Sequence, residues 1–69
     1  MYNYYDSFLV RYIEADEVQR QKSKEHWLKC HMENVKSGRK DLIMFTEQIL
    51  SRISIAESGN AAEYLRNVI

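Results

Sequence analysis

The sequence predicts a small all-α protein, and three observations support this prediction. Proline is absent, and the only two glycines, Gly38 and Gly59, both stand where an apolar helical segment ends. Apolar residues recur at spacings of three and four, which is the pattern of a helix with one buried face. No stretch alternates with period two over the length of a strand. We therefore expect a single domain, residues 1–69, folded as a small helical bundle or a helical hairpin.

The first half of the sequence predicts one long helix over about 5–37, which is bent or broken within 15–24. Two apolar stripes at helical spacing support this interpretation. The N-terminal stripe contains Tyr5, Phe8, Leu9, Tyr12 and Ile13, and the second contains Trp27, Leu28, His31, Met32 and Val35. On one straight helix the stripes would lie about 100° apart, so either two elements meet here or one helix presents different faces to different neighbours. We expect the second stripe to face a core.

Polar residues near the start of each stripe are candidate N-caps, because a short polar side chain can accept a hydrogen bond from the first free amides of a helix. Asn3 or Asp6 can begin the first segment, and Asp16 or Ser23 can begin a new helix after a break. Residues 17–26 are mostly good helix formers, which argues against a break. The sequence leaves the position of the break open.

The second half predicts a helix over about 42–58 and a short one over about 61–68. Gly38 can take the left-handed conformation that ends the preceding helix, and Asp41 can cap the next one. Gly59 repeats the stop signal after the second apolar segment. Each glycine therefore marks a boundary between two helices.

The helix predicted at about 42–58 is apolar around more of its circumference than this chain can readily cover. The expected core face contains Leu42, Phe45, Ile49, Ile53 and Ala56. Ile43 and Leu50 form a second stripe about 100° away, and Met44 and Ile55 lie near a third direction. We expect dimerisation to complete the bundle, with Ile43, Met44, Leu50 and Ile55 as the oligomer interface, or else a partner protein that covers Ile43 and Leu50. The alternative is that the chain's own helices bury them.

Composition limits the class of protein. The chain has 69 residues, 45% of them apolar, with no basic leader and no long apolar run, which indicates a soluble protein and not a membrane protein. The single cysteine, Cys30, excludes an internal disulfide and fits a reducing compartment, so we expect a cytoplasmic location. A chain this short is only marginally stable unless something else supports its core.

Residues 24–35 concentrate the side chains that could form a metal or nucleophile site. His26 and Cys30 are four residues apart and share a helix face, whereas His31 lies about 100° from Cys30. Two ligands are fewer than the four of a structural zinc site, unless a symmetric dimer supplies a second pair. A nucleophilic Cys30 would need a base held by a third group, which the sequence does not show. We expect no metal, no cofactor, no small-molecule substrate and no enzymatic activity.

Residues 20–40 form a basic segment between two acidic ends. This segment carries seven basic and two acidic side chains. By contrast, residues 1–19 carry one basic and four acidic side chains, and residues 41–69 carry two basic and four acidic ones. It can pair with the acidic ends, stay solvated or attract an anionic partner, so nucleic-acid binding is the alternative function. The residues that would contact phosphates are Arg20, Lys22, Lys24, Arg39 and Lys40. A net charge of zero and the apolar start of the next helix argue against this alternative.

An aromatic N-terminal end is the main candidate for a protein contact. Tyr2, Tyr4 and Tyr5 offer large contact area with a polar tip, a kind of side chain that is enriched at protein interfaces. The alternative is that they pack on the protein's own helices. Together with the excess of helical apolar surface, this end predicts a small non-enzymatic regulator, inhibitor or adaptor that binds a protein partner through helix faces.

Overall fold

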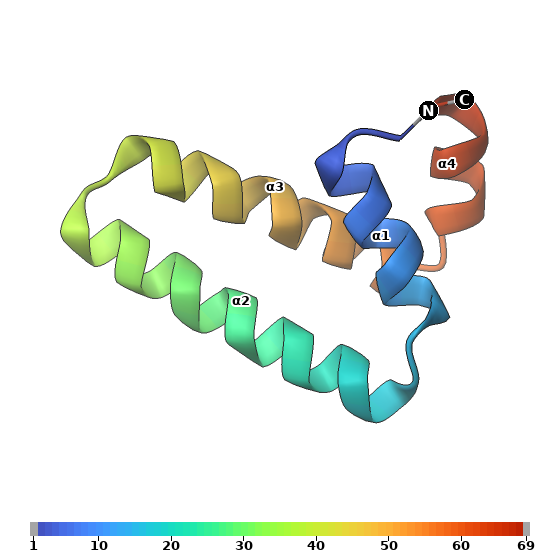
Figure 1. The fold of residues 1–69 in the computed structure, drawn as a ribbon, viewed down its shortest axis with the longest axis horizontal. Helices are drawn as coiled ribbons and strands as arrows, with labels where there is room; N and C mark the ends of the chain where they lie inside the picture. The colour runs from blue at the N-terminus through green and yellow to red at the C-terminus, as the bar shows by residue number, and fades with distance from the viewer. Residues whose placement is uncertain (1, 69) are drawn as a thin grey trace.

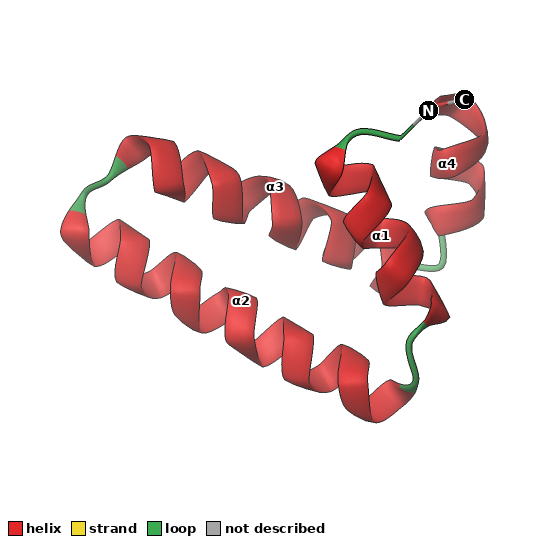
Figure 2. Cartoon of the chain, in the orientation of Figure 1, coloured by secondary structure: helices red, strands yellow, loops and turns green. Residues whose placement is uncertain are grey.

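The computed structural model describes residues 2–68, which contain four helices. Figure 1 shows that short connections join them. The helices are α1 (Tyr4–Glu14), α2 (Glu17–Ser37), α3 (Lys40–Glu57) and α4 (Ala61–Val68). Figure 2 shows helices and loops, with no strand among the described residues. The predicted all-α fold is confirmed.

The interruption of the first helical segment lies at Ala15 and Asp16, within the predicted interval. Both residues have extended backbone angles, with ψ of 156° and 171°. The Asp16 carboxylate accepts a hydrogen bond from the amide three residues later at 2.8 Å, so Asp16, and not Ser23, caps α2. Asn3, and not Asp6, caps α1 through an equivalent bond of 2.8 Å. Two capped helices therefore replace the single long one.

The hairpin of α2 and α3 is the longest part of the molecule, and α1 and α4 pack beside one end of it (Figure 1). The turn between α2 and α3 lies at the other end. Gly38 has a φ of 69° in this turn, and Gly59 has a φ of 79° between α3 and α4. Both glycines take the left-handed conformation expected after a helix, so both predicted boundaries are confirmed.

The buried core lies between α1, α3 and α4. One apolar cluster contains Leu9, Ala61 and Leu65, and the other contains Tyr12, Ile49 and Ile53. The first cluster joins α1 to α4, and the second joins α1 to α3. Ile49 and Ile53 belong to the stripe that the sequence predicts as the core face of its helix, and both are buried.

The second apolar stripe of the sequence does not face a core. None of the residues described in α2 is buried, and Leu28, Met32 and Val35 are 44%, 63% and 53% exposed. The predicted inward orientation is wrong for these three residues, because α1 folds back along α3 instead of lying over α2. From the same stripe, Trp27 and His31 do contact α3. The long helix α2 is therefore covered on one side only.

The helix α3 begins two residues earlier than predicted. Its N-cap is Arg39, and Asp41 lies in the first turn. The predicted Asp41 cap is wrong, because the chain returns to helical geometry at Lys40, directly after the short turn at Gly38. The side chain of Arg39 makes no capping hydrogen bond to the described amides at the start of α3.

Candidate functional site

A row of apolar side chains, exposed on α2 and partly buried on α3, runs along one side of the α2–α3 hairpin. It consists of Leu28, Met32 and Val35 of α2 and Ile43 and Leu50 of α3, and is termed the open hairpin face. The α2 residues follow i, i+4, i+7 spacing and the α3 residues are seven apart, so each set shares one side of its helix. Leu28 and Leu50 both line one groove of 280 Å³ between the helices. The two rows therefore lie on the same side of the hairpin.

The helix α1 occupies the other side of the hairpin. The Phe45 ring lies 5.9 Å from the Tyr5 ring, measured between centroids, and Arg52 Nε donates a hydrogen bond to Asp6. At 100° per residue, Phe45 and Arg52 lie about 140–160° around α3 from Leu50. The open hairpin face is therefore directed away from α1.

Polar contacts hold α2 against α3. From the turn outward, they are Asn34 Nδ2 to the Leu42 carbonyl at 3.1 Å, His31 Nδ1 to Thr46 Oγ1 at 2.8 Å, and Lys24 Nζ to the Glu57 carboxylate at 3.6 Å. Because these pairs define the register of the two antiparallel helices, Leu28 stands level with Leu50, and Val35 stands level with Ile43. Two apolar pairs are thus arranged side by side along the open hairpin face.

The four residues predicted as an oligomer interface do not share one surface. Ile43 and Leu50 belong to the open hairpin face. Ile55 is partly buried against the cluster that joins α1 and α4, so the chain itself covers much of it. Met44 is 64% exposed, but it lies about 160° around α3 from Thr46, which contacts α2. Only two of the four residues therefore combine with the exposed residues of α2.

The three N-terminal tyrosines are also divided. Tyr4 is 56% exposed, and its ring contacts the Tyr5 ring edge-on at 5.6 Å. Tyr5 is partly buried, with the Arg52 guanidinium 5.5 Å from its ring centre. Tyr2 packs against the cluster that contains Leu9. Of the predicted partner-binding group, Tyr4 alone presents most of its side chain to the surface.

A buried polar network that the sequence did not reveal joins α1, α3 and α4. Asp6 is 2% exposed, and its Oδ1 accepts hydrogen bonds from Arg52 Nε at 3.1 Å and from the Tyr64 hydroxyl at 2.7 Å. The Arg52 guanidinium also lies near the rings of Tyr5 and Tyr64. The partners are 46 and 58 residues from Asp6 in sequence, so no local spacing could have indicated the network.

The His26–Cys30 pair forms as helix geometry predicts, with Cys30 Sγ 3.6 Å from His26 Nε2. His31 points elsewhere, toward Thr46 of α3. Within residues 2–68, no three His, Cys, Asp or Glu side chains are grouped so that they could hold a metal ion. The pair offers two ligands on the surface of one helix, which is half of a structural zinc site.

Tyr12 is the titratable residue whose proton affinity changes most clearly. Its hydroxyl donates to Glu57 Oε1 at 2.9 Å, and Glu57 also faces Lys24. Burial, together with the hydrogen bond to Glu57, raises the pKa of Tyr12 to about 12. The hydroxyl therefore holds its proton more firmly than a free tyrosine, which is the opposite of what a base at neutral pH requires.

The five basic residues of the alternative function lie at two separate ends of α2. Arg20 donates a hydrogen bond to the Ala15 carbonyl, and Lys24 is paired with Glu57. Arg39 and Lys40 lie in and after the hairpin turn, 19 or more positions from Arg20, which corresponds to about 29 Å along a helix. Lys22 is exposed on α2. The structure therefore does not bring these residues into one patch.

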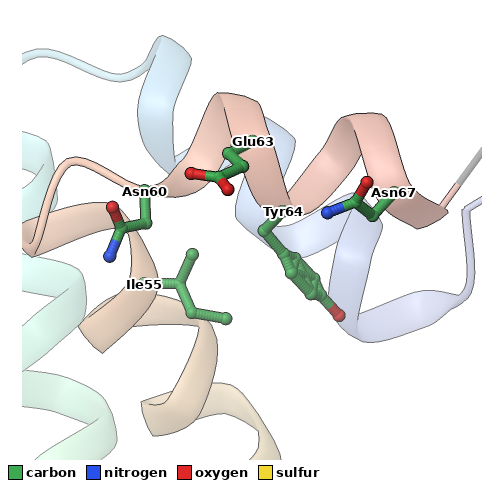
Figure 3. A pocket seen from close by; sticks show the side chains of 5 residues that line it. All are labelled: Ile55, Asn60, Glu63, Tyr64 and Asn67. Atoms are coloured by element: carbon green, nitrogen blue, oxygen red, sulfur yellow. The ribbon is translucent and has the colours of Figure 1, made fainter.

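A second hollow, of 370 Å³, lies between the end of α3 and α4, and Figure 3 shows its lining side chains. Its lining is Ile55, Asn60, Glu63, Tyr64 and Asn67. Tyr64 also serves the buried network through its hydroxyl. With a single carboxylate and two amides, this hollow has no paired acid and base.

No described helix is both long enough and apolar enough to cross a membrane. A scan against protein-family models, a search of curated protein sequences and a search of solved structures gave no match to this chain.

Proposed function

We propose that this chain is a small non-enzymatic protein that acts by binding a protein partner through the open hairpin face, as a regulator, inhibitor or adaptor. The observation that carries the proposal is the exposure of Leu28, Met32 and Val35 beside the partly exposed Ile43 and Leu50. A contiguous apolar surface of this kind on a soluble protein is typical of an interaction site, whereas scattered apolar residues are not.

The shape of the surface supports a helical partner. Two parallel rows of apolar side chains, separated by the groove between α2 and α3, can accept the apolar side of another helix. The groove is flanked by Lys24, Ser54 and Glu57, which provide a polar rim. An apolar centre with a polar rim is the usual composition of a protein interface.

Site-specific photocrosslinking tests the proposal. A photoreactive phenylalanine analogue replaces Met32 on the open hairpin face, and the control carries it at Met44, which has nearly the same exposure but lies elsewhere on the surface. After irradiation in cells that express the protein, we expect a protein adduct, with the same chain or another, at position 32 and not at position 44. The proposal is overturned if position 32 gives no protein adduct, or if both positions give the same adducts.

Nucleic-acid binding is less well supported, because Arg20 and Lys24 make contacts within the chain and Arg39 and Lys40 lie far from them. A gel shift at low salt, where attraction to phosphates is strongest, distinguishes the alternatives. We expect no retardation of single- or double-stranded probes. Retardation that is lost in an Arg39→Gln, Lys40→Gln double variant would instead favour the alternative function.

A further inference from the structure

We infer that the partner of the open hairpin face is a second copy of this chain, and that two α2–α3 hairpins pack face to face as a four-helix bundle. This inference rests on the proposed function, because it names the partner of the same surface. It goes further by fixing the stoichiometry and the relative orientation of the two chains.

The single chain is less compact than its mass predicts. Its accessible surface is 5059 Å², whereas a compact protein of 8.3 kDa is expected to expose about 4,600 Å². Its radius of gyration is 12.4 Å, against about 11 Å for a compact domain of this length. The extents of 35 × 26 × 17 Å describe a flat body. The chain therefore has a broad face for its mass.

The open hairpin face offers the area that a dimer interface needs. The helix α2 has 21 residues and is about 31 Å long, and two adjacent helices are about 20 Å wide. The footprint is then on the order of 600 Å², before the corrugation of side chains is counted. A stable interface buries about 600–1,000 Å² on each partner, so one hairpin face is large enough for a dimer.

The open hairpin face is complementary to a second copy of itself. A two-fold axis that runs parallel to the hairpin, above the groove between α2 and α3 and midway between the two chains, places each α2 over the partner's α3 and keeps the level of every residue. Leu28 then meets the partner's Leu50, and Val35 meets the partner's Ile43. The two apolar rows of one chain therefore match the two rows of the other, as an isologous contact requires.

The charges of the two helices favour this axis over a two-fold axis that runs across the hairpin. The helix α2 carries five basic and three acidic side chains, whereas α3 carries two basic and three acidic ones. Stacking each α2 on the partner's α3 pairs unlike net charges, whereas an axis across the hairpin would stack α2 on α2 and oppose like charges. Lys24 also comes level with the partner's Ser54, close to Glu57.

Sedimentation equilibrium over a range of micromolar concentrations tests the dimer. We expect the wild-type chain to approach twice 8.3 kDa. Val35→Lys puts a charge on the face near the hairpin turn, and Met44→Lys puts one at a similarly exposed position elsewhere. Val35→Lys should weaken dimerisation by about tenfold or more, because the charge would be desolvated, while Met44→Lys should leave it unchanged. A Met32→Lys variant repeats the test if Val35→Lys does not fold.

The dimer is overturned if the folded wild-type chain remains near 8.3 kDa, or if the Val35→Lys and Met44→Lys variants associate equally. A monomeric chain whose Met32 position still crosslinks to a different protein would overturn the dimer and leave the proposed function intact. Loss of all protein adducts at that position would overturn the proposed function itself.

Disulfide trapping tests the orientation in a Cys30→Ala background. One protein carries Lys24→Cys and the other carries Ser54→Cys, which are the residues that the axis along the hairpin brings level. We expect mixed disulfides between the two proteins in excess over either self-linked species. Self-linked Lys24→Cys dimers as the main product would contradict this axis and indicate the perpendicular one.

Discussion

Arg52 Nε donates a hydrogen bond to Asp6 Oδ1 at 3.1 Å, although the two residues are 46 positions apart. Their side chains are 12% and 3% exposed, so this is a nearly buried ion pair. The Tyr64 hydroxyl donates to the same carboxylate oxygen at 2.7 Å. One carboxylate therefore joins α1, α3 and α4, the three helices that form the apolar core.

Asp6→Ala should lower the free energy of unfolding by about 3 kcal/mol or more, because it leaves the Arg52 charge buried without its partner. Urea denaturation followed by circular dichroism measures the change. Asp41→Ala, at an exposed carboxylate, should cost less than about 1 kcal/mol. The double variant Asp6→Leu, Arg52→Met should recover much of the loss, since it removes both charges. Equal losses in Asp6→Ala and Asp41→Ala would show that the buried pair contributes little.

Arg39→Ser should raise the stability by about 0.5–1 kcal/mol. Arg39 has the extended N-cap conformation, with φ of −83° and ψ of 98°, but its side chain does not cap α3. A serine hydroxyl can accept a hydrogen bond from the free amides, and the thermal midpoint reports the gain. Lys40→Ser, one position inside the helix, serves as the control and should give no gain. A midpoint that rises equally in both variants would contradict the capping argument.

Gly38→Ala should destabilise the protein by about 1 kcal/mol, and Gly38→Asn should cost less. The φ of Gly38 is 69°, and no described atom outside the turn would come within 4 Å of an added Cβ. The cost is therefore conformational and not steric, and asparagine tolerates the left-handed region better than alanine. The three urea midpoints should fall in the order glycine, asparagine, alanine. The reverse order of the two variants would refute this explanation.

Stability should decline as the pH rises above 10, partly through Tyr12. The folded pKa of Tyr12 is about 12, against 10 for the ordinary group, so the unfolded chain loses this proton first. The contribution of the Tyr12 hydroxyl to the free energy of unfolding is complete below pH 10 and is lost as the pH approaches 12. Tyr12→Phe should show a shallower decline in this range, measured by urea unfolding at each pH. Tyr64→Phe offers a comparison, because its hydrogen bond to Asp6 also raises the pKa of Tyr64. An unchanged slope in Tyr12→Phe would contradict the assignment.

Local signals predicted the helices and most of their boundaries. Gly38 and Gly59 end helices because the left-handed region costs glycine little, and Asn3 and Asp16 begin helices because their side chains accept from free amides. Each effect acts within one turn, so the sequence contains it. The wrong Asp41 cap shows the limit, because the length of a two-residue turn decided where α3 begins.

The candidate site was only half predictable. The spacing of Ile43 and Leu50 indicated a second apolar side on their helix. The spacing of Leu28 and Val35 indicated a stripe as well, but periodicity shows which residues share a side and not what that side faces.

The sequence by itself determined the class of fold, the two glycine boundaries and the apolar stripes, because these depend on interactions within a few residues. Only the tertiary structure decided that α1 folds back along α3, which leaves α2 exposed on one side. The same packing joined Asp6 to Arg52 and Tyr64. Such contacts depend on the direction in which the chain leaves Ala15 and Asp16. The orientation of helices after a break is set by the packing of side chains far apart in sequence, and no local pattern contains it.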